Sequence, residues 1–228
     1  MQTIADRLES AYKMIAHATE VAHRPAKSVK LLAVSKTKPV SDLQQAYAAG
    51  QRLFGENYVQ EGVDKIIEMS AYSDIEWHFI GPLQSNKTKA VAEHFAWVQS
   101  VDRLKIARRL SAQRPTDRSP LNICIQVNID NEETKSGVAP DEVEDFAKEL
   151  TKLPNIELRG LMAIPSNSSD VAMQKASFSR MNELFTHLKQ QYSTIDTLSI
   201  GMSNDAEIAI ECGSTMVRIG TAVFGRRD

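Results

Sequence analysis

The run Leu31-Leu32-Ala33-Val34-Ser35, followed at once by Lys36, is the first of a series of short apolar segments in this chain. Amphipathic stretches, with apolar residues three and four positions apart, fill the gaps between these segments. Strands are predicted over residues 31–35, 52–54, 77–80, 97–100, 121–128, 157–162, 197–200 and 216–219. Helices are predicted over residues 2–23, 41–49, 58–69, 84–94, 103–113, 140–151, 171–191 and 204–212.

This alternation predicts an α/β fold. Eight strands separated by helices favour a parallel sheet closed into a TIM-type (β/α)8 barrel, because short crossovers are right-handed and place the helices on one outer face. An open doubly wound sheet is the alternative. Only nine residues follow the eighth strand, so we expect the extra N-terminal helix over residues 2–23 to close the outer ring. No internal repeat or interdomain tether is visible, and residues 1–228 are predicted to form a single domain.

Composition excludes several classes of protein. The 228 residues are 42% hydrophobic and 25% charged, and 27 Lys and Arg against 29 Asp and Glu give a net charge of -2. No basic field for a nucleic-acid backbone is therefore expected. Charged residues interrupt the first 25 positions, which predicts no signal peptide or membrane span and a cytoplasmic protein. Cys124 and Cys212 are expected to be reduced, and no HExxH or CxxC spacing suggests a metal site.

Lys36 is the most informative candidate for chemistry. Active sites of such barrels lie at the carboxyl ends of the strands, and Lys36 comes just after the first strand. It shares one face with Leu32 and Val34, so it points inward if that face lines the barrel. A desolvated lysine has a depressed pKa and acts as a Schiff-base nucleophile. The alternative is a solvated lysine at a strand end.

Two further features follow the last two strands. Gly201-Met202-Ser203-Asn204 and Ile219-Gly220-Thr221 are glycine-containing turns with hydroxyls, placed where such barrels often bind phosphate. Ordinary turn chemistry is the alternative. Arg218 is a cation within an apolar strand and should need a partner, either inside the barrel or on a helix outside it. An inward lysine, a phosphate cup and this arginine together suit a phosphorylated aldehyde, of which pyridoxal 5'-phosphate (PLP) is one.

Ordered sequence blocks then resemble a known family. They cover nearly the whole chain and read LLAVSKTKP at 31–39, FGENYVQE at 54–61, WHFIGPLQSNK at 77–87, KSG at 135–137, RGLM at 159–162, LSIGMS at 198–203 and VRIGT at 217–221. In this order they resemble the YggS/PROSC family of pyridoxal phosphate homeostasis proteins. The family usually carries a few residues beyond the final Arg227-Asp228 pair, so the resemblance leaves only the tail open.

The resemblance implies a fold similar to the N-terminal barrel domain of alanine racemase and PLP as the cofactor. It assigns the Schiff base to Lys36 and the phosphate to Ser203, Gly220 and Thr221. It also implies that Arg218 faces the pyridine nitrogen. Asn57 and Met202 are expected close to the cofactor.

A cation beside the ring nitrogen lowers the pKa of that nitrogen and weakens the electron sink, so little catalytic power is expected. The family resemblance then implies a carrier, a protein that holds PLP as a Schiff base and serves PLP homeostasis and amino-acid balance. An amino-acid racemase of low activity is the alternative. It needs two positioned proton-transfer groups, of which only Lys36 is evident, and related racemases carry a second domain for which this chain has no room. A Schiff-base aldolase acting on a sugar phosphate is a third possibility. We expect a monomer whose partners are PLP and PLP-dependent enzymes that receive it.

Overall fold

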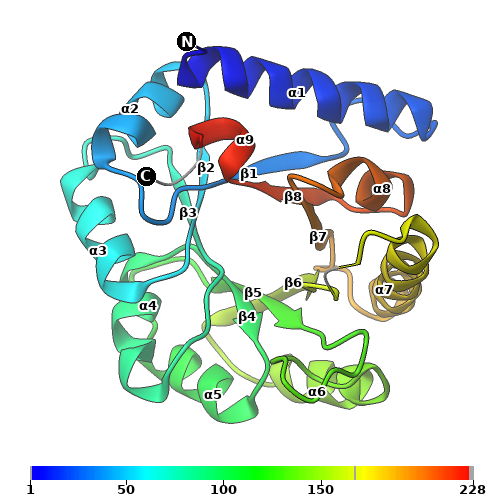
Figure 1. The fold of residues 1–228 in the computed structure, drawn as a ribbon. Coiled ribbons are helices and arrows are strands. Elements are labelled where there is room, and N and C mark those ends of the chain that lie inside the picture. Colours follow the sequence, from blue (N-terminus) through cyan, green and yellow to red (C-terminus); the bar gives the residue numbers. More distant parts are fainter. Residues whose placement is uncertain (1, 167, 226–228) are drawn as a thin grey trace.

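The strands of the computed structural model, which describes residues 2–166 and 168–225, form a closed parallel barrel (Figure 1). Each strand pairs with the next in the chain, and the last pairs with the first. The strands are β1 (Lys30–Val34), β2 (Leu53–Glu56), β3 (Glu76–Phe79), β4 (Trp97–Val101), β5 (Leu121–Gln126), β6 (Ile156–Met162), β7 (Thr197–Met202) and β8 (Met216–Ile219). The predicted (β/α)8 barrel is confirmed, and the open sheet is excluded.

Helices surround this barrel (Figure 1). The α-helices of the described residues are α1 (Ile4–Val21), α2 (Val40–Ala48), α3 (Val59–Glu68), α4 (Thr88–His94), α5 (Leu104–Gln113), α6 (Val143–Leu150), α7 (Val171–Gln191), α8 (Ala206–Glu211) and α9 (Thr221–Phe224). Short 3-10 turns, η1 (Ser85–Lys87) and η2 (Pro140–Glu142), precede α4 and α6.

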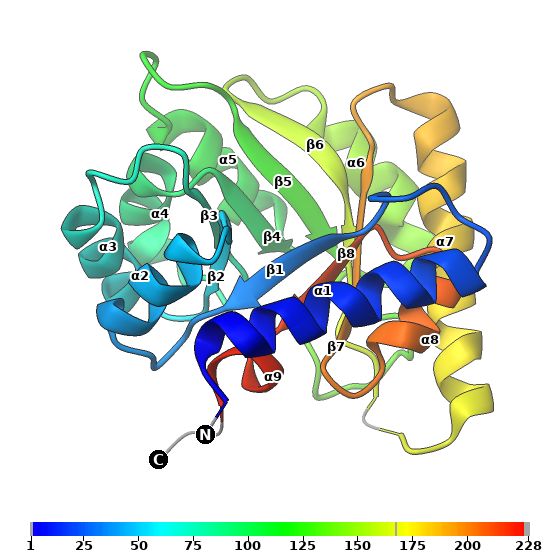
Figure 2. The same ribbon diagram turned by 90° about the horizontal axis from the view of Figure 1, so that it is seen from above.

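Helix α1 closes the ring, as predicted. Its start is fixed by a capping box, in which the Asp6 N–H donates to Thr3 Oγ1 at 3.1 Å and the Thr3 N–H donates to Asp6 Oδ2 at 2.9 Å. Its buried face, which includes Leu8 and Ile15, packs toward the barrel, and the helix contacts α2, α8 and α9. Figure 2 shows α1 on the same side of the barrel as α8 and α9. The four-residue helix α9 was not predicted.

Some predicted strand ends were wrong. The second strand continues to Glu56, because Gly55 pairs with His78 and Glu56 with Phe79. Its glycine and glutamate hide this strand from a pattern of apolar residues. The fifth strand ends at Gln126 instead of residue 128, and Val127 forms only an isolated bridge, outside the named strands.

The hydrophobic core has an outer and an inner layer. The outer layer lies between strands and helices and includes Leu31 and Ala33 of β1. A separate inner cluster contains Leu32, Ile80 and Met216, with Val34 and Leu53 packed against it, and another contains Trp97, Cys124 and Met162. Because Leu32 belongs to the inner cluster and Val34 packs against it, the predicted inward face of β1 is confirmed.

Membrane-spanning character was searched in the described residues. No helix there is long and apolar enough to cross a bilayer. Cys124 and Cys212 are free thiols.

Candidate functional site

The candidate site lies on one arc of the barrel rim. β1 pairs with both β2 and β8, and β8 pairs with β7, so the ends of these four strands are neighbours. The residues expected in the site occupy or follow these ends: Lys36, Asn57, Met202, Ser203, Arg218, Gly220 and Thr221.

Lys36 stands in a turn just beyond β1. The strand ends at Val34, and the turn is closed by the Lys38 N–H, which donates to the Ser35 carbonyl at 3.1 Å. The side chain of Lys36 is half-buried. Lys36 therefore belongs to the carboxyl-end rim, at the mouth of the barrel whose interior Leu32 and Val34 line.

Gly220 brings the end of β8 against the end of β1. A Cβ at this position would lie 3.2 Å from the Val34 carbonyl oxygen and 3.4 Å from Val34 Cβ. Glycine therefore allows the turn after β8 to pack beside the strand that leads into Lys36. Thr221, the first residue of α9, is exposed next to this contact.

The turn after β7 differs from the prediction. Helix α8 begins at Ala206 and not at residue 204, so Ser203 and Asn204 lie in a turn. Asp205 shapes this turn, because its Oδ1 accepts a hydrogen bond from the Met202 N–H at 2.6 Å. The helical pattern that follows led to a helix start predicted two residues too early, because it gives no sign of the hydrogen bond from the Met202 N–H to Asp205. Ser203 is exposed, and Met202 is 40% exposed.

Arg218 points into the barrel. It shares a strand face with Met216 of the inner cluster, and it is only 4% exposed. Its Nη1 donates to Ser199 O at 2.7 Å and to Ser199 Oγ at 2.8 Å, and its Nη2 donates to Ala163 O at 2.8 Å. Burial lowers the pKa of Arg218 to about 10, so it is charged at neutral pH. The partner expected for this cation is a set of neutral oxygens, and an outward orientation is excluded.

A buried hydrogen-bonded chain continues from Arg218 through the barrel. Ser199 Oγ donates to Gln99 Oε1 at 2.6 Å, and Gln99 Nε2 contacts His78 Nδ1 at 2.9 Å. Because an amide nitrogen only donates, His78 Nδ1 accepts, and His78 Nε2–H donates to Glu76 Oε1 at 2.9 Å. The chain thus crosses from the amino end of β3 to the carboxyl-end arginine.

These supporting residues were not predicted. Ser199, Gln99 and His78 are each 0% exposed, and burial lowers the pKa of His78, which keeps it neutral at pH 7. The only local signal was a polar residue inside an apolar strand, as Gln99 is in Trp97-Val98-Gln99.

Asn57 carries an unsatisfied acceptor. It follows β2 and is half-buried, and its Oδ1 is buried without a hydrogen-bond partner in the structure. Leaving such an acceptor unpaired is costly. A bound group with a hydrogen-bond donor, together with an anionic end suited to the hydroxyls of Ser203 and Thr221, therefore fits this rim, as PLP does.

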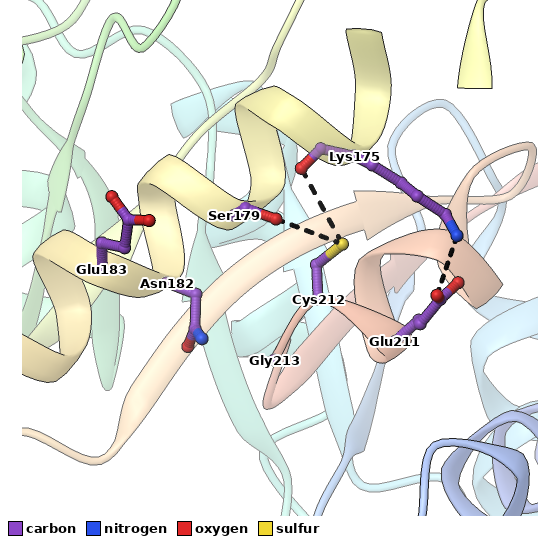
Figure 3. Close-up of a pocket in the computed structure, with 7 residues that line it drawn as sticks. All are labelled: Lys175, Ser179, Asn182, Glu183, Glu211, Cys212 and Gly213. Atoms are coloured by element: carbon purple, nitrogen blue, oxygen red, sulfur yellow. Dashed lines mark hydrogen bonds and ion pairs between the residues drawn. The ribbon is translucent and has the colours of Figure 1, made fainter. Parts of the chain in front are cut away.

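The cavity in Figure 3 is a different place. It encloses about 410 Å³ between α7 and the end of α8 and is lined by Lys175, Ser179, Asn182, Glu183, Glu211, Cys212 and Gly213. None of the expected site residues lines it. Lys175 Nζ pairs with Glu211 Oε1 at 2.8 Å, and burial raises the pKa of the Cys212 thiol. Nothing there is an activated nucleophile.

Comparison with known proteins defines the class first. The family described as "Alanine racemase, N-terminal domain" matches residues 11–228, in agreement with the barrel and its added helix. The pyridoxal phosphate homeostasis protein of Pasteurella multocida is 58% identical over 229 residues, which cover 99% of this chain and 98% of that protein. The chain belongs to the family of pyridoxal phosphate homeostasis proteins, the YggS/PROSC family that its sequence blocks resemble.

Solved structures agree. PipY of Synechococcus elongatus, in a structure with PLP bound, superposes with a TM-score of 0.83 at 36% identity and covers 98% of this chain and 100% of that chain. Alanine racemase from E. faecalis superposes with a TM-score of 0.72 at 15% identity, over 95% of this chain and 58% of that one. The racemase likeness is evidence for the fold alone.

Proposed function

We propose that this chain binds PLP at the β1–β2–β7–β8 arc of the rim and serves the homeostasis of that cofactor and of amino-acid pools. The observation that carries the proposal is the close approach of Gly220 to Val34, where a Cβ added to the glycine would lie 3.2 Å from the Val34 carbonyl oxygen. It sets a turn suited to an anion beside the turn that bears Lys36. The PLP-bound structure of PipY and the names of the relatives support the choice of ligand.

Lys36 is proposed as the covalent attachment point. Its neutral amine forms a C–N bond to the aldehyde carbon of PLP, the carbonyl oxygen leaves as water, and a Schiff base results. Because the reaction is reversible with water, the same bond lets the protein release the aldehyde intact.

The other residues hold the rest of the cofactor. We propose that Ser203, Gly220 and Thr221 bind the phosphate, through hydroxyl and backbone N–H donors. Arg218 faces the pyridine nitrogen, and Asn57 and Met202 flank the ring. The unpaired Oδ1 of Asn57 supports this placement, since a ligand donor would satisfy it.

Arg218 favours holding the cofactor over transforming substrates. PLP supplies an electron sink for amino-acid chemistry when its ring nitrogen is protonated. A charged Arg218, with its pKa about 10, disfavours that protonation because the two positive charges repel each other. We therefore propose a carrier with no robust catalytic activity, from which PLP-dependent enzymes receive cofactor. We propose in addition that this carrier is a cytoplasmic monomer.

The proposal is tested by the visible spectrum of the PLP-loaded protein. Wild type and Lys38→Ala, the control at the neighbouring lysine, are expected to show a Schiff-base band, and Lys36→Ala is expected to lack it. Borohydride reduction followed by peptide mass spectrometry should place the cofactor mass on Lys36. Cofactor on another lysine, or a band that persists in Lys36→Ala, would contradict the assignment.

A further inference from the structure

Lys65 is a buried cation on α3, and it is not among the residues of the site described above. Its residue is 5% exposed, and lysine is almost never buried so fully unless it is paired. Its Nζ donates to Glu61 Oε1 at 2.6 Å, to Glu56 Oε1 at 2.9 Å and to the Ser35 carbonyl at 2.8 Å. We call Lys65, Glu56 and Glu61 the Lys65 clamp.

The clamp reaches both chain neighbours of Lys36. On one side, Ser35 accepts from Lys65 through its carbonyl and donates from Oγ to Glu56 Oε1 at 2.5 Å. On the other side, the Thr37 N–H donates to Glu61 Oε1 at 2.6 Å. Lys36 is therefore the residue between two anchored peptide units.

The anchored turn is conformationally strained. Thr37 has φ of 63°, and a β-branched residue in the left-handed region is an outlier that persists only when its surroundings hold it there. Contacts of the clamp with Ser35 and Thr37 provide that hold. Strain of this kind clusters at functional sites.

We propose that Lys65 is a positioning residue that, through Glu56 and Glu61, fixes the backbone on both sides of Lys36 and so aims its amine at the barrel mouth. This inference rests on the proposed function, because the aim of Lys36 matters only if its amine reacts. Under this proposal the Lys65 clamp, although it lies outside the barrel, sets the rates at which the cofactor is captured and released, because a small misplacement of a reacting group slows its reaction.

A purely structural ion pair would give a different result from a positioning one. Loss of a structural pair lowers stability and leaves the reaction of folded molecules unchanged. Loss of a positioning pair slows covalent capture of PLP, while binding of pyridoxine 5'-phosphate, which has the phosphate and ring but no aldehyde, stays the same. The ratio of these two quantities is therefore the informative readout.

The experiment compares Lys65→Met, Glu61→Ala and the control Val63→Ala. Val63 lies on the same helix and packs in the outer core, and its hydrocarbon side chain cannot hydrogen-bond to the turn. Glu61→Ala removes the acceptor of the Thr37 N–H and leaves the more buried Glu56 in place, so it serves if Lys65→Met does not fold. We measure the rate of appearance of the Schiff-base band, the Kd for pyridoxine 5'-phosphate, and amide hydrogen exchange of residues 35–38 in the protein without cofactor.

We expect Lys65→Met and Glu61→Ala to slow capture by about tenfold or more, to change the pyridoxine 5'-phosphate Kd by less than about twofold, and to speed exchange of residues 35–38. Val63→Ala should match wild type in all three once corrected for folded fraction. Capture within about twofold of wild type in a folded clamp variant, or an equal loss in Val63→Ala, overturns the positioning role. A wild-type protein that forms no Schiff base at Lys36 overturns the proposed function instead.

Discussion

Arg218 and Ser199 are joined by two hydrogen bonds inside the barrel, from Nη1 of the arginine to the backbone oxygen and to Oγ of the serine, at 2.7 and 2.8 Å. The same Oγ donates to Gln99. The serine hydroxyl therefore uses both its donor and its acceptor capacity. Ser199 thus supports the site from inside the barrel, whereas an exposed serine such as Ser203 is available to a ligand.

Replacement of Ser199 by alanine is expected to lower the free energy of unfolding by about 1–3 kcal/mol, because a buried charge-assisted hydrogen bond is lost and Gln99 Oε1 loses its donor. Ser203→Ala is the matched control. Its side chain is exposed, so its stability should stay within about 0.5 kcal/mol of wild type while PLP binding weakens. Urea unfolding without cofactor and a PLP titration check both. Equal losses of stability in Ser199→Ala and Ser203→Ala would contradict this distinction between a residue that supports the fold and a residue that contacts the ligand.

The neutral state of His78 predicts an acid-sensitive term in stability. Burial lowers the pKa of His78 below its ordinary 6.5 in the folded protein, whereas in the unfolded chain it titrates near that value. The contribution of neutral His78 to the free energy of unfolding is fully present above pH 6.5. It declines as the pH falls below that point, because only the unfolded state takes up the proton, and is completely lost once the pH falls through the folded pKa.

The measurement is urea unfolding of wild type and His78→Gln between pH 7.5 and 5. Taking the difference cancels the titration of groups common to both proteins. Relative to the variant, wild type should lose up to about 1.4 kcal/mol of unfolding free energy per pH unit below the unfolded pKa. Parallel curves would show that His78 accepts a proton as readily in the folded state as in the unfolded one.

Local periodicity was enough to predict the barrel and the inward face of β1. Leu32 and Val34 alternate with Leu31 and Ala33, and the structure divides them between inner and outer core layers as the pattern predicts. Ring closure by α1 followed from a helix with no strand before it. These features depend on near neighbours in the chain, which a sequence pattern records.

Features that depend on distant pairs could not be read in this way. Ser199 and Gln99 are 100 positions apart in the sequence, and Gln99 and His78 are 21 apart. The series of hydrogen bonds that supports Arg218 therefore forms only when β3, β4, β7 and β8 come together in the barrel. The strand position of Glu56 was missed because its burial is stabilised by Lys65 and Ser35 from other elements. The roles of Lys36, Asn57 and the phosphate turn stay predictions.

Gly201 predicts a large effect of a single methyl group. Its φ is +96°, and a Cβ there would lie 2.6 Å from Ala209 Cβ. Gly50 is the matched control, since its φ is +100° and nothing lies within 4 Å of its Cβ position. Both alanine variants suffer backbone strain, but Gly201→Ala should lose about 1–3 kcal/mol more stability, because only it overpacks the core.

Thermal or urea unfolding of the two glycine variants measures that difference. The added methyl group should also displace the backbone at Met202 and Ser203, which follow Gly201 directly. PLP affinity should therefore fall in Gly201→Ala and not in Gly50→Ala. Similar stability in the two variants would mean that α8, which carries Ala209, moves away from β7 at little cost.

Asn57 predicts a conflict between stability and binding. Its Oδ1 is buried without a partner, whereas the side chain of Asn122 is satisfied, donating to Ala96 O at 3.1 Å and accepting from Arg159 Nη1 at 2.8 Å. Asn57→Leu should therefore leave the stability of the cofactor-free protein unchanged or raise it by about 1 kcal/mol, and Asn122→Leu should lower it by about 1–3 kcal/mol. If Asn57 meets the cofactor, its variant alone also loses PLP affinity. An Asn57→Leu protein as destabilised as Asn122→Leu would mean that the Asn57 amide maintains the fold, since a residue kept for a ligand is dispensable to the folded chain without it.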